Sequence, residues 1–202
     1  MLAQKLPPLT KNAIKPGKSA FLVIDMYESL TDVSSSCSGK SKLTNRVSNW
    51  IRDTFTYSNE SVVAQTCKTI QFGKSLGIET FVITYGDSPI DKKILEAAGY
   101  PKVINKYDMD VFLASNLKQH LKERSIENVI VSGYHREECV FHSVQGAAKN
   151  GFGVIVANPL TLSESTRYAY SETTEKFKQI ADVCFTISDL HKLMHKLSIS
   201  YN

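Results

Sequence analysis

Three residues of this 202-residue sequence have side chains that could together carry out acyl transfer. Cys139 stands at the start of an apolar helical pattern, where the helix dipole favours a thiolate. Asp25 ends an apolar run, and its carboxylate could take the thiol proton and return it to a leaving group. Lys106 precedes another helical segment, and its ammonium could stabilise the thiolate. Backbone N–H groups at the helix start could hold an oxyanion.

Such side chains need a scaffold, and the chain alternates between strand-like and helix-like segments. Short apolar runs, typical of strands buried on both faces, lie at 19–24, 79–84, 128–132, 153–157 and 183–187. Helical patterns lie at 61–76, 116–124, 139–150 and 171–180. This alternation predicts an α/β fold with a parallel sheet covered by helices on both faces.

In a sheet of this kind, ligands bind beyond the carboxyl ends of the strands. That rule selects Asp25 with Met26, residues 85–89 and residues 133–139. Residues 27–59 form an irregular, partly Ser-rich insertion directly after the first strand, and they could form a lid over this edge. We expect one domain over residues 1–202, with residues 1–17 as an N-terminal extension.

Composition narrows the function classes. With 42% hydrophobic and 22% charged residues, the chain can bury a core without crosslinks. No run approaches the ~20 apolar residues of a membrane span, and the first residues have no apolar signal region. The net charge of +4 is spread along the chain, so nucleic acid is not an expected partner. We expect a cytoplasmic protein with a small-molecule substrate and no membrane partner.

The cysteines give no sign of a metal site. Cys37, Cys67, Cys139 and Cys184 form no C-x-x-C pair and have no His at zinc-ligand spacing. Cys67 and Cys184 fit as buried apolar side chains, and Cys37 lies in the Ser-rich stretch. His135 fits a pocket-lining position better than a ligand position, since a metal needs three or four ligands. We therefore expect no metal and no organic cofactor.

Four stretches together resemble the isochorismatase-like cysteine hydrolases, a family that includes nicotinamidases and N-carbamoylsarcosine amidases. Residues 21–26, Phe-Leu-Val-Ile-Asp-Met, are similar to the first strand of the family and its acidic residue. Lys106, followed by Phe112, Ser115 and Leu117, is similar to the segment with the family lysine. Residues 131–140 are similar to the segment with the nucleophilic cysteine, and 146–151 to the end of the following helix. The resemblance covers about residues 19–190.

The resemblance implies a triad of Asp25, Lys106 and Cys139 on a three-layer, Rossmann-like fold with a mostly parallel six-stranded sheet. It also implies a cis peptide bond between Tyr134 and His135, and oxyanion donors at the backbone N–H groups of His135 and Cys139. Positions that match substrate-binding or oxyanion positions of the family are Tyr134, His135, Tyr27 and Phe112. Since members commonly pair or form rings, a homo-oligomer is expected.

The chain departs from the family pattern close to these residues. Tyr27 stands where the family has Gln, and Arg136-Glu137 replaces Thr-Asp before the cysteine. Asn158-Pro159 replaces Asp-Ala after a later strand, and Asp110-Val111 replaces Ser-Ala. The Asp-x-His metal motif of nicotinamidases has no counterpart, because residues 85–89 contain no His. Nicotinamidase activity is therefore not expected.

The leading hypothesis is a cysteine hydrolase that cleaves a C–N bond of a small amide or ureido compound through a thioester. One alternative is a binding or regulatory module on the same scaffold, because Glu137 and Glu138 would raise the thiol pKa if they faced Cys139. Another is a redox sensor, because an activated thiol is also readily oxidised.

Overall fold

The computed structural model describes residues 11–15, 17–28, 59–113, 115–163 and 167–199. Six strands form one sheet in the order β3-β2-β1-β4-β5-β6, and all five pairs of neighbours are parallel. The strands are β1 (Lys18–Ile24), β2 (Glu79–Tyr85), β3 (Ile104–Lys106), β4 (Ile126–Gly133), β5 (Gly153–Thr161) and β6 (Asp182–Cys184). The predicted α/β fold is confirmed, and the sheet is wholly rather than mostly parallel.

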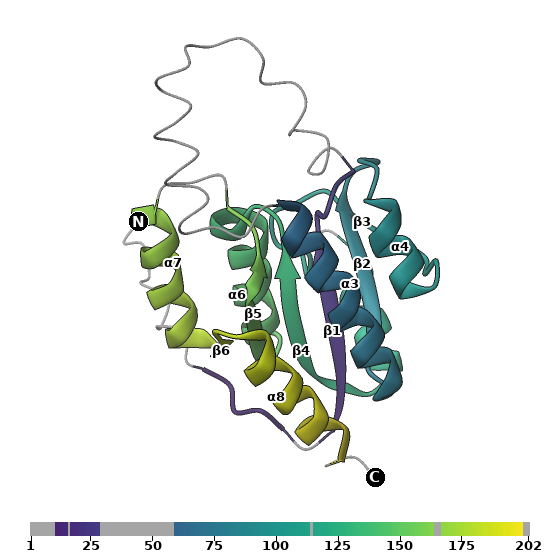
Figure 1. The fold of residues 1–202 in the computed structure, drawn as a ribbon. Helices are drawn as coiled ribbons and strands as arrows, with labels where there is room; N and C mark the ends of the chain where they lie inside the picture. The colour runs from purple at the N-terminus through teal and green to yellow at the C-terminus, as the bar shows by residue number, and fades with distance from the viewer. Residues whose placement is uncertain (1–10, 16, 29–58, 114, 164–166, 200–202) are drawn as a thin grey trace.

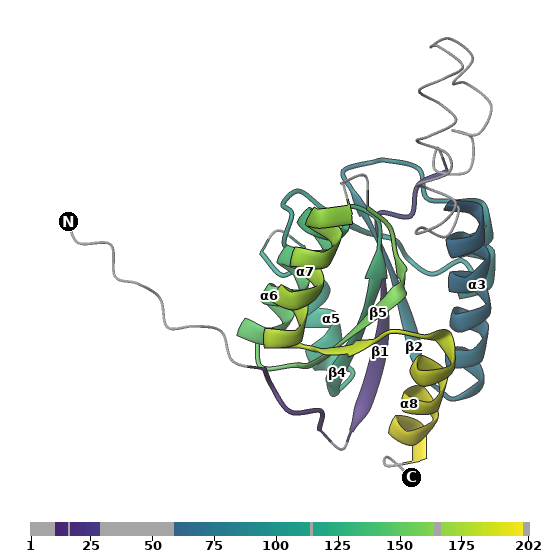
Figure 2. The same cartoon turned by 60° about the vertical axis from the view of Figure 1, so that its left-hand side comes forward.

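Helices cover both faces of this sheet, which gives three layers (Figures 1 and 2). The helices are α3 (Asn59–Ser75), α4 (Lys92–Ala98), α5 (Leu117–Glu123), α6 (Phe141–Lys149), α7 (Arg167–Ile180) and α8 (Ile187–Ile199). A π-helical turn, η1 (Arg136–Val140), leads directly into α6. Within the described ranges, no helix has the length and apolar character needed to cross a bilayer.

Each face of the sheet has its own hydrophobic core, because side chains of a strand alternate between the two faces. On one face, α5, α6 and α7 bury side chains such as Leu121, Val144 and Phe177 against Leu22 of β1. On the other face, α3, α4 and α8 bury Ile70, Ile94 and Met194 in the same way. This double burial explains why the strands read as unbroken apolar runs in the sequence.

The carboxyl ends of four strands bring distant parts of the chain to one edge of the sheet. Asp25 follows β1, Tyr85 ends β2, Lys106 ends β3 and Gly133 ends β4. Gly133 has a φ of +147°, and a Cβ there would overlap the carbonyl oxygen of Ile24. The missing side chain thus lets the end of β4 approach β1, where the Tyr134 N–H donates to that carbonyl oxygen at 2.9 Å.

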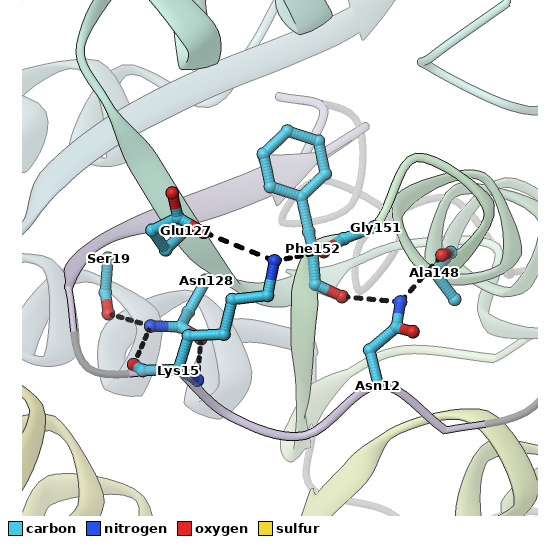
Figure 3. A network of polar contacts seen from close by, with 8 residues as sticks. All are labelled: Asn12, Lys15, Ser19, Glu127, Asn128, Ala148, Gly151 and Phe152. Carbon is cyan, nitrogen blue, oxygen red and sulfur yellow. Dashed lines mark hydrogen bonds and ion pairs between the residues drawn. The ribbon is translucent and has the colours of Figure 1, made fainter.

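At the opposite edge, part of the N-terminal extension packs across the amino ends of β4 and β5 (Figure 3). The buried amide of Asn128 accepts from the Lys15 N–H and donates to the Lys15 carbonyl oxygen, both at 2.9 Å. Asn12 donates to the carbonyl oxygens of Ala148 and Phe152 at 2.7 and 3.0 Å. Residues 11–15 are therefore tied to the body of the domain by side-chain amides rather than by strand pairing.

Two short elements carry too little pattern to be predicted. β3 has only three residues, and α4 has seven, with Asp91 capping its start and left-handed Gly99 ending it. The predicted strand at 183–187 is too long, because Ile187 already begins α8. Apart from Tyr27, Glu28 and Asn59, the insertion proposed as a lid lies outside the described residues, as does Cys37.

Candidate active site

Asp25 lies in the first position after β1, with its side chain fully buried. Its backbone N–H still donates to Ile83 of β2 at 2.9 Å, but its φ of +55° is left-handed. A non-glycine residue in this region costs about 1–3 kcal/mol, so neighbouring packing must hold it there. The result is a strand that ends abruptly with a carboxylate inside the protein.

Lys106 ends β3 and is also fully buried. Its Nζ lies 2.9 Å from Oδ2 of Asp25 and donates to Sγ of Cys139 at 3.1 Å. It also donates to the carbonyl oxygen of Asp108 at 3.3 Å and lies 4.8 Å from the ring centre of Tyr85. One ammonium thus connects the carboxylate that follows β1 with the sulfur of η1.

Cys139 is the fourth of the five residues of η1, and α6 begins two residues later, at Phe141. The turn is fixed at its start by His135, whose carbonyl oxygen accepts from the N–H groups of Glu138 and Val140 at 3.0 and 3.2 Å. Cys139 is 6% exposed, so a small molecule must be able to reach a nearly buried sulfur.

The charges around Cys139 favour the protonated thiol. Burial and the negative charge of Asp25 raise the pKa of Cys139, while Lys106 lowers it, and the net result is a pKa of about 11. Lys106 thus favours the thiolate, as expected from the sequence, but burial and Asp25 outweigh its effect on the pKa of Cys139. A reaction of Cys139 near neutral pH needs a group that takes its proton.

Asp25 has the free acceptor capacity for this proton. Its only ion pair among the described residues is the one with Lys106, and neither of its buried oxygens accepts a well-oriented hydrogen bond there. A carboxylate paired with a single cation, next to a protonated thiol, is suited to general-base work. The structure thus brings together the three groups predicted from the sequence, with Lys106 in contact with both Asp25 and Cys139.

Aromatic side chains lie next to Asp25. The ring centres of Tyr134 and His135 lie 4.2 Å apart, and Tyr27 lies 6.5 and 6.4 Å from them. Burial and the interaction of the Tyr27 hydroxyl with Asp25 raise the pKa of Tyr27, so its phenol stays protonated beside the carboxylate. Tyr27, Tyr134 and His135, which we name the aromatic cluster, therefore border the Asp25 side of the site.

Phe112 packs in the core against Phe152, with ring centres 5.7 Å apart, in the same hydrophobic cluster as Cys139. The described residues contain no cis peptide bond, so the cis bond expected between Tyr134 and His135 is wrong. His135 turns the chain instead through a left-handed conformation, with a φ of 55°.

Buried polar contacts that no sequence pattern indicated hold the segment after Lys106. Asp110 is buried, and its Oδ1 accepts from the Phe112 N–H at 2.9 Å. Ser143 of α6 accepts from the Val111 N–H and donates to the Met109 carbonyl oxygen, both at 3.2 Å. The small residues of α6 that face this segment were the available signal, since a large side chain would exclude it.

None of the described residues form a group of three or more His, Cys, Asp or Glu that could hold a metal ion. Cys67 and Cys184 lie away from Lys106, on α3 and β6, and are free thiols. Burial and the nearby Asp189 and Asp182 raise the pKa of Cys184 to about 11. Cys184 therefore resembles Cys139 in burial and pKa, but it lacks the lysine.

Comparison with known proteins gives a consistent result. The family model of the isochorismatase domain matches residues 19–188. Among solved structures, the nicotinamidase of Staphylococcus aureus is 19% identical, with a TM-score of 0.58 over 83% of this chain and 99% of that one. The N-carbamoylsarcosine amidase of Thermoplasma acidophilum is 16% identical, with a TM-score of 0.59 over 84% and 98%.

The MAR1 ribonuclease of Caenorhabditis elegans is similar to the same extent, at 17% identity and a TM-score of 0.64 over 91% of each chain. Comparison with curated protein sequences found no match. At these identities the solved structures show the fold alone, and they carry different activities. The family match, which covers most of the chain, shows more: this protein belongs to the isochorismatase family of hydrolases.

Proposed function

We propose that this protein is a cysteine hydrolase that cleaves a C–N bond of a small amide or ureido compound. The observation that carries the proposal is the position of Lys106 Nζ, 2.9 Å from Asp25 and 3.1 Å from the Cys139 sulfur. Cys184, equally buried, has no such arrangement among its described neighbours. The similarity to an amidase adds support from a protein of the same fold.

In the proposed reaction, Asp25 takes the proton of Cys139 as the sulfur attacks the carbonyl carbon of the substrate. The S–C bond forms, and the carbonyl oxygen becomes an oxyanion that the backbone N–H groups of His135 and Cys139 hold. The C–N bond then breaks, and Asp25 returns the proton to the departing nitrogen. Asp25 then takes a proton from water as the water oxygen attacks the thioester; the C–S bond breaks, the acid leaves, and Asp25 returns the proton to the Cys139 sulfur.

Lys106 has two roles in this proposal. Its ammonium stabilises the thiolate at the moment the proton leaves, and it keeps Asp25 oriented while the carboxylate changes charge. The raised pKa of Cys139 fits a mechanism in which the proton moves to Asp25 during attack, rather than one with a permanent thiolate. The reaction as written needs no metal or organic cofactor.

The binding-module alternative rested on Glu137 and Glu138 facing Cys139. Glu137 accepts hydrogen bonds from Ser163 at 2.7 Å, and Glu138 is exposed, so the acids that influence the Cys139 pKa do not include them. The redox-sensor alternative needs an accessible thiolate, whereas burial and Asp25 keep Cys139 protonated. Hydrolysis is the chemistry that these residues favour.

The test is a panel of small amides and ureido compounds, scored by release of ammonia or amine, with wild type, Cys139→Ala and Cys184→Ala. We expect turnover in the wild type and in Cys184→Ala, and none in Cys139→Ala, with all three folded by circular dichroism. Turnover that survives in Cys139→Ala contradicts the proposal. Cys184→Ala is the matched control, because it removes a thiol of similar burial and pKa.

A further inference from the structure

Arg136, the first residue of η1, is fully buried together with its guanidinium group. One guanidinium nitrogen, Nη1, donates to the hydroxyl of Thr161 at the end of β5. The other, Nη2, donates to Oδ1 of Asn158 at 2.8 Å and to the hydroxyl of Thr174 in α7 at 2.6 Å. One side chain therefore ties the turn that carries Cys139 to both β5 and α7.

Two aromatic rings lie close to the guanidinium of Arg136. Its central carbon lies 4.0 Å from the ring centre of Tyr170 and 4.8 Å from that of Phe177. No described carboxylate forms an ion pair with Arg136, and its Nε has no hydrogen-bond partner among the described residues. Burial lowers the pKa of Arg136, and the interactions with Tyr170 and Glu137 offset this only in part. The hydrogen bonds to Asn158, Thr161 and Thr174 therefore hold a charged group whose burial is otherwise unfavourable.

The backbone of Arg136 also forms hydrogen bonds that hold η1 in place. Its N–H donates to the Leu162 carbonyl oxygen at 2.9 Å, and its own carbonyl oxygen accepts from Phe141, where α6 begins. Both ends of η1 thus depend on this residue. Cys139 is three residues further on, so a tilt of the turn would move its sulfur relative to Lys106 Nζ.

The partners of Arg136 also connect two features of the sequence. Arg136 and Asn158 both stand where the chain departs from the family pattern, and they are 22 positions apart. The structure shows that these two departures contact each other through the 2.8 Å hydrogen bond. Asn158 in turn donates to the Tyr170 hydroxyl at 3.0 Å. Arg136, Asn158 and Tyr170 therefore form one cluster next to η1. This cluster lies toward β5 and α7, whereas the sulfur of Cys139 contacts Lys106 of β3.

We propose that Arg136 is a positioning residue for Cys139: anchored on Asn158, Thr161 and Thr174, it holds η1 so that the sulfur stays against Lys106. This inference rests on the proposed function, since it assigns Arg136 a role only through Cys139. Arg136 touches neither the substrate nor the reacting atoms in this view. Its loss changes the reactivity of Cys139 and not only the stability of the fold.

The test measures alkylation of Cys139 by iodoacetamide against pH, read by mass spectrometry, in wild type and Arg136→Met. Methionine keeps an unbranched apolar stem as far as the position of Nε and removes the rest of the guanidinium, with its charge and its three hydrogen bonds. If the sulfur moves away from Lys106, the charged group that remains near it is Asp25, and the apparent pKa of Cys139 rises. We expect an upward shift of about one pH unit, seen as roughly 10-fold slower alkylation at pH 8.

Controls separate positioning from stability. Alkylation of Cys184 in the same samples serves as the internal reference and stays unchanged. Met194→Ala, in the core on the other face, lowers the melting temperature without moving the Cys139 midpoint. In Arg136→Lys, which keeps the charge, we expect a smaller upward shift of the Cys139 pKa than in Arg136→Met. If Arg136→Met does not fold, Thr174→Val removes one anchor, and we expect a two- to threefold effect in the same direction.

The outcomes are distinguishable. A wild-type midpoint in folded Arg136→Met, or in Thr174→Val where the first variant fails to fold, overturns this inference. If Lys106→Met and Asp25→Asn still move the midpoint in that case, the proposed function stands without it. If none of these variants moves the midpoint, the proposed function fails as well.

Discussion

Lys106 donates a 3.1 Å hydrogen bond to the sulfur of Cys139, and the two residues, 33 positions apart in the sequence, are both buried. Burying a charged ammonium group is costly, and the contacts of Lys106 with Cys139 and Asp25 offset part of this cost. The electrostatic balance of these three side chains determines how Cys139 reacts. Several of its consequences can be measured without a substrate.

Lys106→Met leaves the Asp25 carboxylate buried without a cation. We expect a loss of about 3–5 kcal/mol in the free energy of unfolding, the usual cost of breaking a buried pair. The apparent pKa of Cys139 rises further, because Lys106 is the group that lowers it. Urea denaturation and alkylation against pH measure the two effects. A double variant with Asp25→Asn recovers part of the stability; equal loss in single and double variants contradicts the pairing.

Asp25→Asn shifts the thiol in the opposite direction. The negative charge of Asp25 raises the pKa of Cys139, so its removal lowers that pKa and accelerates alkylation at pH 8. Turnover of any substrate falls by at least about 100-fold, because the proton acceptor is gone. This variant thus gives a more reactive thiol and a less active enzyme. Slower alkylation in Asp25→Asn would show that the carboxylate does not face the sulfur.

Because the pKa of Cys139 is raised in the folded protein, the free energy of unfolding decreases as the pH becomes alkaline. The unfolded thiol loses its proton near pH 9.0, before the folded one does near pH 11. The contribution of the buried thiol is therefore complete below about pH 9 and is lost as pH rises through 11. We expect the difference in unfolding free energy between wild type and Cys139→Ala to shrink across this window. For Val144→Ala, a core variant with no titrating group, the difference stays constant.

Gly146 of α6 lies against Asp110, in the segment that follows Lys106. A Cβ at Gly146 would overlap the Asp110 carboxylate, so Gly146→Ala displaces this segment. Alanine normally stabilises a helix interior by about 1 kcal/mol over glycine, whereas overpacking costs about 1–3 kcal/mol, so we expect a net loss of stability. The Cys139 midpoint also moves, since Lys106 shifts with the segment. Adding Asp110→Ala relieves the overlap, and a double variant no more stable than Gly146→Ala would refute this explanation.

Asn128→Ala tests the opposite edge of the sheet. Its amide satisfies both the N–H and the carbonyl group of Lys15, and losing it costs about 1–3 kcal/mol of stability. The alkylation midpoint of Cys139 is unaffected, because residues 11–15 pack at the amino ends of the strands (Figure 3). Lys15→Ala is the matched control: it removes only an exposed side chain that contacts Glu127 and Gly151, and it costs about 0–1 kcal/mol.

The sequence was sufficient to predict the scaffold and the three residues, Asp25, Lys106 and Cys139, that the structure brings together. Strands buried on both faces leave continuous apolar runs, and these runs end at Asp25 and shortly before Cys139, so the edge of the sheet where both lie could be predicted. Lys106 was selected by its charge and its place before a helical segment, with support from the resemblance; its own strand was not predicted, because three residues have no measurable periodicity. The fold class and the family are confirmed.

The tertiary structure decided what surrounds these residues. The contact between Arg136 and Asn158, the packing of Asp110 on Gly146 and the place of Phe112 in the core depend on segments that are far apart in the sequence. The direction of the Cys139 pKa shift belongs here too. Helix placement and a lysine suggested a lowered pKa, but burial and the distance to Asp25 outweigh them. Residue types set which charges are present, whereas only distances and burial in the folded chain set which charge dominates.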